Sequence, residues 1–460
     1  MTSLKKNSIT VACAVLLFLV TGIIPYAQQQ LYSFNVEAEG STCVNYEQTE
    51  NKITIDCDAS FVDVVQTIND PDVIENLGNG DYILDANIEV ADGVTFEMTS
   101  NGIDNLQYLK IAGANGIIVY GKIVINGVTI TSWDVSDDDI IQQNINGTIP
   151  RGYIQFAASE GSQIINSEFG YLGYVEPGRR GFDLFGDGPS HDMLITGSKF
   201  HDMWMAFYSN GAYNITVDGN EYYNNIKYSL DPHTTTHDMK IINNWIHNNP
   251  IGPICSDRCW DILIDGNVIQ DTANAAIFFS RNMTDSIARN NHVINARTGI
   301  LLSESPNNQV YNNTIEGATE GGILLYNPVL LDDGSTTGNI VYNNIISNSE
   351  NGIRATRTHD NTVQNNTFSE IESREYRILG DSSITIRGQH FDNTLIAGDD
   401  SQTGNLVEIA DSGTIQVTDG ASDDDDDDGQ GGGGALYNTD NEPYRTTLSD
   451  GDSITVNSPS

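Results

Sequence analysis

Residues able to move a proton or bind an anion gather between positions 228 and 305. Among them His233 is the best proton acceptor near neutral pH. Asp231 lies two residues earlier, so the two side chains share a face if the segment is extended. A nearby arginine can bind a carboxylate in a bidentate way and neutralise its charge. The set comprises Tyr228, Asp231, His233, Asp257, Arg258, Arg281 and Glu304.

Such a set suits abstraction of the proton α to the carboxylate of a uronate sugar. With the carboxylate neutralised, the developing enolate is stabilised electrostatically. Reprotonation on the opposite face would invert the carbon, which is epimerisation, whereas loss of the 4-linked sugar would be a lyase reaction. Spacing alone leaves both reactions open, together with a polar surface that carries these residues without catalysis.

The elements that position these residues are predicted by an internal repeat. Short blocks such as ITVDGNEYYNN, MKIINNWIHNN and NIVYNNIISNS share an Asn, which recurs at intervals of 22–24 apart from two longer intervals of 31. The repeated position is occupied by Ser167, Ser198, Asn220, Asn244, Asn267, Asn291, Asn313, Asn344 and Asn366. Each unit contains short alternating apolar strands and no run with helical periodicity.

This pattern predicts an all-β fold, a right-handed parallel β-helix solenoid with 22–24-residue coils. One coil cannot bury its apolar faces alone, but stacked coils form a continuous aliphatic core. The Asn tolerates left-handed backbone geometry and can bond to the Asn of the next coil. Residues at one offset from this Asn are therefore expected side by side: offset 13 gives His233, Asp257, Ser280 and Glu304, and offset 14 gives Thr234, Arg258, Arg281 and Ser305.

Composition shifts divide the chain into five parts. Residues 1–27 have two lysines, an apolar run and a Pro-Tyr-Ala end, as in a secretory signal peptide, with an uncleaved anchor as the alternative. Residues 28–79 are expected to cap the stack, and 80–420 to form the β-helix. Residues 421–434 are an Asp/Gly-rich linker, and 435–460 are a tail that can add a strand to the last coil.

The cysteines fit an exported protein. Once the signal segment is removed, four remain, and their spacing predicts two local disulfides, Cys43–Cys57 and Cys255–Cys259, in preference to metal ligation.

The segment YSLDPHTTTHD (228–238) resembles the YG-hydrophobic-DPH motif of mannuronan (alginate) C5-epimerases, and the likeness to the periplasmic bacterial type covers roughly 80–370. Further collinear segments that look like those of this family are TSWD (131–134), PRGYI (150–154), INSEFGYLGY (165–174), SKFHDMWMAFY (198–208), SRN (280–282), GILLSESPNN (299–308) and NGIR (351–354).

The resemblance implies a right-handed β-helix acting on an acidic polysaccharide rich in β-D-mannuronate. His233 would remove the C5 proton, Asp231 would lie in the groove, and Tyr228 matches the motif tyrosine. Arg258 is the candidate for neutralising the substrate carboxylate. Candidate substrate-binding residues are Asp257, Arg281, His237, Glu304, Arg179 and Arg180.

Two departures from the family pattern fall in the groove. The family has Asp or Glu directly after DPH, whereas this chain has Thr234, and its basic run is replaced by NNPIGP (248–253). Both changes touch the expected substrate-binding wall, so the fold follows from the resemblance more directly than the activity.

The net charge is −42, from 63 acidic and 21 basic residues. It argues against nucleic acid and anionic membranes as partners. The partner that the resemblance implies is an acidic polysaccharide. We expect a monomer that is secreted, periplasmic or on the cell surface. No metal-site motif is present, so no cofactor is expected to be required; calcium remains possible because the Asp423–Asp428 run attracts cations loosely. The alternatives are a non-catalytic polysaccharide-binding protein of the cell surface or matrix, and a polysaccharide lyase.

Overall fold

The computed structural model describes residues 43–379 except 103 and 329–334, residues 382–387, and six short strands nearer the C-terminus. The chain divides into two units, 1–41 and 42–460, and every described element belongs to the second. The expected signal peptide (1–27) and linker (421–434) lie outside the described residues, as does part of the expected cap. Within the described residues, no helix is long and apolar enough to cross a bilayer.

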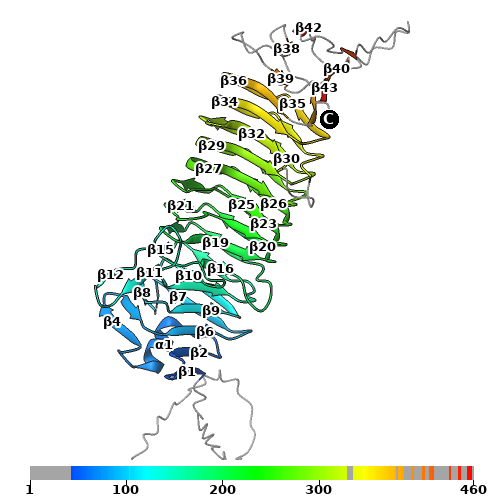
Figure 1. Cartoon of the computed structure of the whole chain (residues 1–460). Coiled ribbons are helices and arrows are strands. Elements are labelled where there is room, and N and C mark those ends of the chain that lie inside the picture. Colours follow the sequence, from blue (N-terminus) through cyan, green and yellow to red (C-terminus); the bar gives the residue numbers. More distant parts are fainter. Residues whose placement is uncertain are drawn as a thin grey trace, which may run out of the picture. The chain divides into compact units, whose positions relative to one another are not determined.

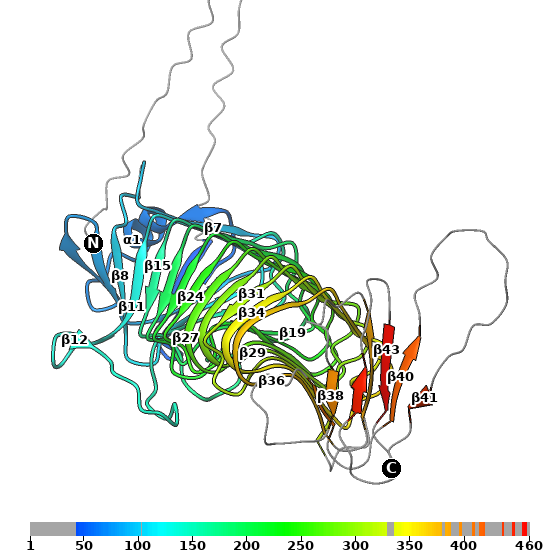
Figure 2. The ribbon, with the colours of Figure 1, turned by 90° about the horizontal axis from the view of Figure 1, so that it is seen from above.

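The described chain winds into a parallel β-helix whose coils stack in sequence order (Figures 1 and 2). Each regular coil contributes to three faces, which we call faces I, II and III. Face I contains β3 (Ala59–Ser60), β7 (Thr95–Thr99), β10 (Lys122–Asn126), β14 (Gln163–Ile165), β17 (Leu194–Thr196), β20 (Tyr213–Asp218), β23 (His237–Ile242), β26 (Trp260–Asp265), β28 (Ile287–Arg289), β30 (Gln309–Tyr311), β33 (Ile340–Tyr342), β35 (Asn361–Gln364) and β37 (Ser383–Arg387).

Faces II and III belong to one continuous sheet. Face II contains β5 (Asp81–Leu84), β8 (Tyr108–Ala112), β11 (Thr129–Asp134), β15 (Glu168–Gly170), β18 (Lys199–His201), β21 (Glu221–Tyr223), β24 (Trp245–His247) and β31 (Thr314–Glu316). Face III contains β2 (Lys52–Ile55), β6 (Asn87–Val90), β9 (Gly116–Val119), β13 (Tyr153–Phe156), β16 (Gly181–Leu184), β19 (Met205–Asn210), β22 (Asp231–His233), β25 (Ile254–Ser256), β32 (Gly321–Tyr326) and β39 (Val407–Ile409). Four long strands run through both: β27 (Val268–Ser280), β29 (His292–Ser303), β34 (Ile345–Thr356) and β36 (Thr367–Leu379).

Strand pairing on face I confirms the predicted coil lengths. Ile215 pairs with Met239, and Met239 pairs with Ile262, so each partner lies one predicted interval further along the chain. Gln309 pairs with Ile340, which reproduces one of the two longer intervals. The all-β solenoid predicted from the repeat is therefore the observed architecture.

The repeated Asn residues form a buried ladder along the turn that precedes face II. From Asn220 to Asn366, each side-chain Nδ2 donates to Oδ1 of the next Asn at 2.9–3.1 Å. Each backbone N–H in the series from Asn220 to Asn344 donates to the same Oδ1. Ser198 and Ser167 continue the ladder upstream, as the repeat predicted. These amides satisfy backbone groups that would otherwise be buried without partners.

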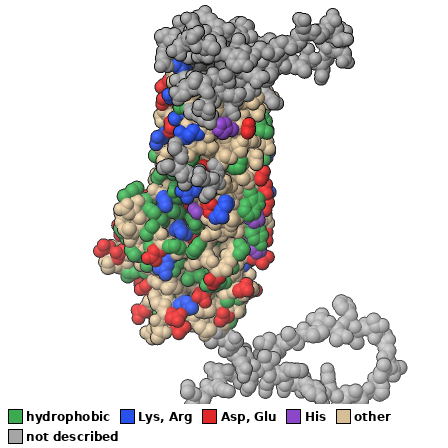
Figure 3. Space-filling view, turned by 45° about the vertical axis from the view of Figure 1, so that its right-hand side comes forward, with side chains coloured by type: hydrophobic (Ala, Val, Ile, Leu, Met, Phe, Trp, Pro, Cys, Tyr) green, Lys and Arg blue, Asp and Glu red, His purple; other side chains and the backbone are tan. Residues whose placement is uncertain are grey.

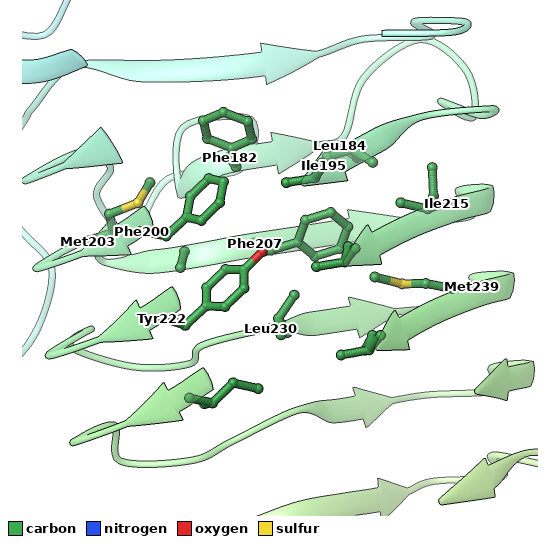
Figure 4. Packing of buried hydrophobic residues seen from close by; sticks show 14 of the residues in the cluster. Phe182, Leu184, Ile195, Phe200, Met203, Phe207, Ile215, Tyr222, Leu230 and Met239 are labelled. Atoms are coloured by element: carbon green, nitrogen blue, oxygen red, sulfur yellow. The ribbon is translucent and has the colours of Figure 1, made fainter. Parts of the chain in front are cut away.

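The interior is a column of apolar side chains that point inward from the three faces. Figure 4 shows Phe182, Phe200, Phe207, Tyr222 and Leu230 in contact between consecutive coils. The Phe200 and Tyr222 rings are stacked with centroids 4.8 Å apart. Burying each such side chain contributes about 1.5–3 kcal/mol, so the stack supplies a rigid support for the surface residues.

The N-terminal end is closed by a short amphipathic helix, α1 (Phe61–Ile68), with buried Phe61 and Val64. A capping box joins Ser60 and Asp63 at its start. Parallel pairing reaches back to β2 and β3, so the coils begin earlier than residue 80. Two antiparallel strands flank this end: β1 (Val44–Glu47) pairs with β2, and β4 (Ile74–Gly78) pairs with β5.

The tail adds a strand to face I, as expected from the sequence: β43 (Ser453–Asn457) pairs antiparallel with β37 and with β40 (Thr414–Thr418). The remaining short strands are β12 (Asp139–Ile140), β38 (Leu395–Ala397), β41 (Ala435–Leu436) and β42 (Tyr444–Thr446).

Candidate active site

The candidate site lies on face III, where β22 carries Asp231 and His233 outward on either side of Pro232. Strand pairing places Tyr208 of the preceding coil opposite Asp231, and Asn210 opposite His233. Asp231 is 2% exposed, whereas His233 is partly exposed. The alternation predicted for these two residues therefore places both side chains on one surface.

The predicted columns are wrong by one residue on alternate coils. The residues that align with His233 on the following coils are Ser256, Ser280 and Ser303. Ser280 was predicted, but Asp257 and Glu304 lie one position later, in the turn after face III. The cause is that every second coil is one residue shorter between the Asn ladder and this turn. Glu304 is three coils beyond His233, or about 14 Å at the usual strand spacing, too far to act with it directly.

Tyr208 is the residue that the sequence reasoning missed. Its ring centroid lies 5.4 Å from that of His233, and the Arg180 guanidinium lies 3.9 Å from its centroid on a cation–π contact. Burial raises the pKa of Tyr208 to about 12. The signal was available, because Tyr208 precedes Asp231 by one coil interval of the repeat.

Arg180 is held by a buried carboxylate. Its Nη1 lies 3.2 Å from Oδ2 of Asp183, which is fully buried. Burial raises the pKa of Asp183 to about 6, and the Arg180 charge opposes that rise. Arg179 points elsewhere, donating to the Tyr174 hydroxyl at 2.7 Å and pairing with Glu176 at 3.3 Å. Of the two predicted arginines in this coil, only Arg180 joins the cluster around His233.

A hydrogen-bonded chain runs from His233 through Thr234 to Asp257. Nδ1 of His233 lies 2.6 Å from Oγ1 of Thr234, and that hydroxyl donates to Oδ2 of Asp257 at 3.3 Å. Hydrogen bonding from Arg258 holds the pKa of Asp257 below its usual value, so the acceptor is a carboxylate. Because the Thr234 hydroxyl donates its hydrogen bond to Asp257, the Thr234 oxygen accepts a hydrogen bond from Nδ1–H of His233. This arrangement leaves the lone pair on Nε2 of His233.

The turn that carries this chain of hydrogen bonds is held in uncommon backbone geometry. Thr234 and Thr235 have φ of 23° and 60°, and Asp257 and Arg258 have φ of 101° and 55°. Left-handed geometry is unfavourable for β-branched residues. The same turn is also left-handed on the next coil, at Arg281 and Asn282. The Cys255–Cys259 disulfide closes the loop that contains Asp257 and Arg258, and the expected Cys43–Cys57 bond is also present.

The charges around His233 favour its neutral form. Burial lowers its pKa most; Asp257 raises it, and Arg180, Arg281 and Lys227 lower it further. His233 is therefore unprotonated at neutral pH, as a general base must be.

Asp231 and Tyr228 complete the floor of the site. Burial raises the pKa of Asp231 to about 8, and its Oδ1 has no hydrogen-bond partner in the described part of the chain. Burial also raises the pKa of Tyr228, with a further rise from Asp231 and a decrease from Arg281. Lys227 lies 4.9 Å from the Tyr228 ring centroid. Both acids are thus protonated at neutral pH.

The other predicted residues are only partly brought together. The Arg258 side chain is 60% exposed and forms an ion pair with Asp257 at 2.8 Å, within the same turn. Arg281 is exposed, and its charge acts on both His233 and Tyr228. His237 lies on face I, stacked between Tyr213 and Trp260, and therefore faces away from His233.

An open pocket of about 580 Å³ lies at the turns that join faces II and III, and no residue of the cluster around His233 lines it. It is bounded by the loop at 143–145, the turn at 225–226 and the segment 248–250, where the chain departs from the epimerase pattern. No Lys or Arg lines it, and its polar groups are mainly amides. Figure 3 shows Lys and Arg side chains (blue) gathered in the middle of one face, with Asp and Glu (red) along its edge. Among the described residues, one cluster has ligand atoms that converge for a metal, Glu160–His191–Asp192, and it does not include His233.

Comparison with known proteins matches this fold. A family model for the right handed beta helix region matches residues 180–329. The mannuronan C5-epimerase of Pseudomonas putida is 25% identical over 240 residues, covering 48% of this chain and 45% of that protein. That of Pseudomonas syringae pv. tomato is 23% identical over 256 residues, covering 53% and 47%. The chain thus spans about half the length of these relatives.

Solved structures agree on the architecture. The periplasmic alginate epimerase AlgG superposes with a TM-score of 0.59 at 20% identity, covering 72% of this chain and 85% of that one. PfbA, a surface adhesin of Streptococcus pneumoniae, superposes with a TM-score of 0.50 at 14% identity, covering 76% and 99%. The fold is thus shared by an enzyme and an adhesin, and it does not by itself decide between catalysis and binding. The chain is a right-handed parallel β-helix protein that resembles the mannuronan C5-epimerases in sequence.

Proposed function

We propose that this chain is an exported polysaccharide C5-epimerase that inverts C5 of β-D-mannuronate, or of a similar uronate, within a polymer. The observation that carries the proposal is the His233–Thr234–Asp257 chain, which leaves the lone pair on Nε2 of the partly exposed His233. The charges of Arg180, Arg281 and Lys227 act on the same imidazole. The sequence likeness to mannuronan C5-epimerases supports the substrate class.

In this mechanism Nε2 of His233 removes the C5 proton, and the C5–H electron pair enters the carboxylate as an enolate. The Tyr228 hydroxyl gives a proton to the opposite face of C5, and solvent then reprotonates the tyrosinate. The raised pKa of Tyr228 keeps it protonated until that step. His233 returns its proton to solvent before the next turnover. General acid and base groups of this kind contribute about 10²–10⁴-fold each.

Arg281 and Lys227 are our candidates for binding the substrate carboxylate. Both charges act on His233, whereas Arg258 is bound to Asp257 and serves to keep that carboxylate ionised. Asp257 also supplies, through Thr234, the carboxylate that the family places directly after DPH. The unusual Thr234 is thereby reconciled with the same chemistry.

The test is proton NMR of mannuronan incubated with the protein, which should show guluronate signals that increase with time. His233→Gln should abolish them, while His237→Gln, a histidine on another face, should leave them within about twofold. Ultraviolet absorbance from unsaturated chain ends would instead identify a lyase. Retention of the polymer with neither product would identify a binding protein.

A further inference from the structure

Three His-Asp dipeptides share one local geometry on this solenoid. In His191–Asp192, His201–Asp202 and His237–Asp238, Nδ1 lies 2.7–2.9 Å from Oδ2 of the following Asp. Each Asp has φ between 50° and 57°. Each imidazole also stacks on an aromatic ring of the next coil, at centroid distances of 4.6, 4.9 and 4.3 Å. The shared geometry orients the rings and by itself indicates a structural role.

The three dipeptides differ in what the preceding coil places beside the ring. Tyr213 precedes His237, and it offers no carboxylate. Glu168 bonds to the other nitrogen of His201, Nε2, at 3.2 Å. Beside His191 stands Glu160, aligned by a backbone bridge.

Unlike Glu168, which bonds to Nε2 of His201, Glu160 makes no side-chain hydrogen bond to the histidine beside it among the described residues. Its carboxylate makes no side-chain hydrogen bond or ion pair with any described residue, yet ligand atoms of Glu160, His191 and Asp192 lie within 4.8 Å of one another. His191 is fixed against Tyr213 with an interplanar angle of 12°, and Asn214 Nδ2 donates to Asp192. Two of the three groups are thus held in place, and the exposed Glu160 side chain is free to rotate toward them.

We infer that Glu160, His191 and Asp192 form a binding site for a divalent transition metal, with Zn²⁺ as the best match. Imidazole nitrogen and carboxylate oxygen are both ligands of Zn²⁺, with ligand distances of about 2.0–2.2 Å. Mg²⁺ and Ca²⁺ prefer all-oxygen sites with more ligands. The bound metal leaves room for water in the remaining coordination positions, because Glu160 and Asp192 are exposed.

The site would tie together two successive coils, since Glu160 and His191 are paired across adjacent turns of the solenoid. His191 follows the segment 185–190 that leaves β16, the strand that carries Asp183. Zn²⁺ binding is therefore expected to stabilise this coil and to weaken as the pH falls, because the ligands must be deprotonated.

The test is isothermal titration calorimetry of the full chain with Zn²⁺ in the presence of excess Mg²⁺. The Mg²⁺ saturates weak, nonspecific cation binding by acidic side chains elsewhere on the surface. One saturable Zn²⁺ site is expected in the unaltered protein. Glu160→Gln and His191→Gln should each weaken it at least tenfold, whereas His237→Gln, which alters the same local motif without the third ligand, should not. Thermal unfolding of each variant without metal, monitored by circular dichroism, checks that the variant is folded.

Two results would overturn the inference. One is the absence of saturable Zn²⁺ binding in the presence of Mg²⁺. The other is binding by folded Glu160→Gln with an affinity within twofold of the unaltered protein, which would assign the metal to the general acidic surface.

Discussion

At the scale of single residues, the proposed chemistry depends on the proton position of His233. Thr234 fixes that position, since its hydroxyl donates to Asp257 and must accept from Nδ1. Replacing Thr234 by Val removes the hydroxyl and keeps the shape. We expect kcat to fall by about 10²-fold, within the range for a general base. Thr234→Ser should restore most of the activity.

The neighbouring Thr235 is the matched control for that change. It shares the left-handed geometry but makes no hydrogen bond to His233. Thr235→Val should leave kcat within about twofold. An equal loss in both variants, measured by initial rates on mannuronan, would mean that the turn as a whole matters and that the Thr234 hydroxyl does not orient the base.

The pH profile provides a second test of His233. Its pKa is lowered from the ordinary 6.5, and activity requires the neutral form, so the acid limb of kcat/KM should have its midpoint below pH 6.5. Arg281 contributes to that decrease, so Arg281→Gln should move the limb to higher pH. Asp257 raises the pKa, so Asp257→Asn should move it to lower pH. Shifts in the opposite directions would exclude His233 as the titrating base.

Asp231 should affect stability in a pH-dependent way. Burial raises its pKa from 3.8 to about 8, so the folded state keeps a proton that the unfolded state loses. The penalty is absent below pH 3.8 and grows as the pH rises toward 8. Asp231→Asn should therefore stabilise the protein increasingly between pH 4 and 8, measured as the difference in denaturant midpoint. A constant difference across that range would contradict the raised pKa.

Residue identities were only partly predictable from the sequence. The proximity of His233, Asp231 and Tyr228 could be predicted, because they are close together in one motif. Arg258 was assigned to the substrate carboxylate, but it pairs with Asp257. Tyr208 and the Thr234–Asp257 bond were missed, because both depend on contacts between coils. Alternate coils differ in length by one residue, and this difference changes which residues lie opposite one another.

At the scale of elements, the Asn ladder determines how the coils stack. Asn267 is fully buried and bonds to Asn291, to its own coil and to the Ile241 carbonyl oxygen. Replacing it by Ala leaves several buried groups without partners, at about 1–3 kcal/mol each. Asn267→Ala should therefore lower the unfolding midpoint strongly. The exposed Asn274→Ala should not, and equal midpoints for the two variants would show that the ladder contributes little.

The sequence predicted the regular elements well, because the Asn spacing and the apolar alternation independently indicate the same coil length. The loops that interrupt the regular coils were less predictable. The loop at 143–145 and the segment 248–250 meet at a pocket although they are far apart in the chain. Neither has a repeated pattern, so their meeting depends on tertiary packing alone.

At the scale of the whole molecule, the net charge of −42 is unevenly distributed. Residues 401–460 hold 13 acids and one base, a net charge of −12, while 151–310, around His233, hold 17 acids and 10 bases. An anionic polymer would thus meet long-range repulsion and local attraction at Arg281 and Lys227.

These two effects should give an optimum in salt. At about 10 mM salt the Debye length is about 30 Å and the repulsion acts fully, whereas at about 0.1 M it is about 10 Å and the short contacts remain. We expect kcat/KM on mannuronan to rise between these concentrations and to fall near about 1 M, where the Debye length is about 3 Å. A steady fall from the lowest salt would show that attraction dominates at every range.

The central claim is that His233 removes the proton from C5 of a uronate in a polymer. The most direct measurement is NMR of mannuronan incubated with the protein in D₂O, compared with the His233→Gln variant. The account predicts deuterium at C5 of newly formed guluronate residues, and none with the variant. The absence of both deuterium and guluronate with the unaltered protein, or equal incorporation by the variant, would contradict it.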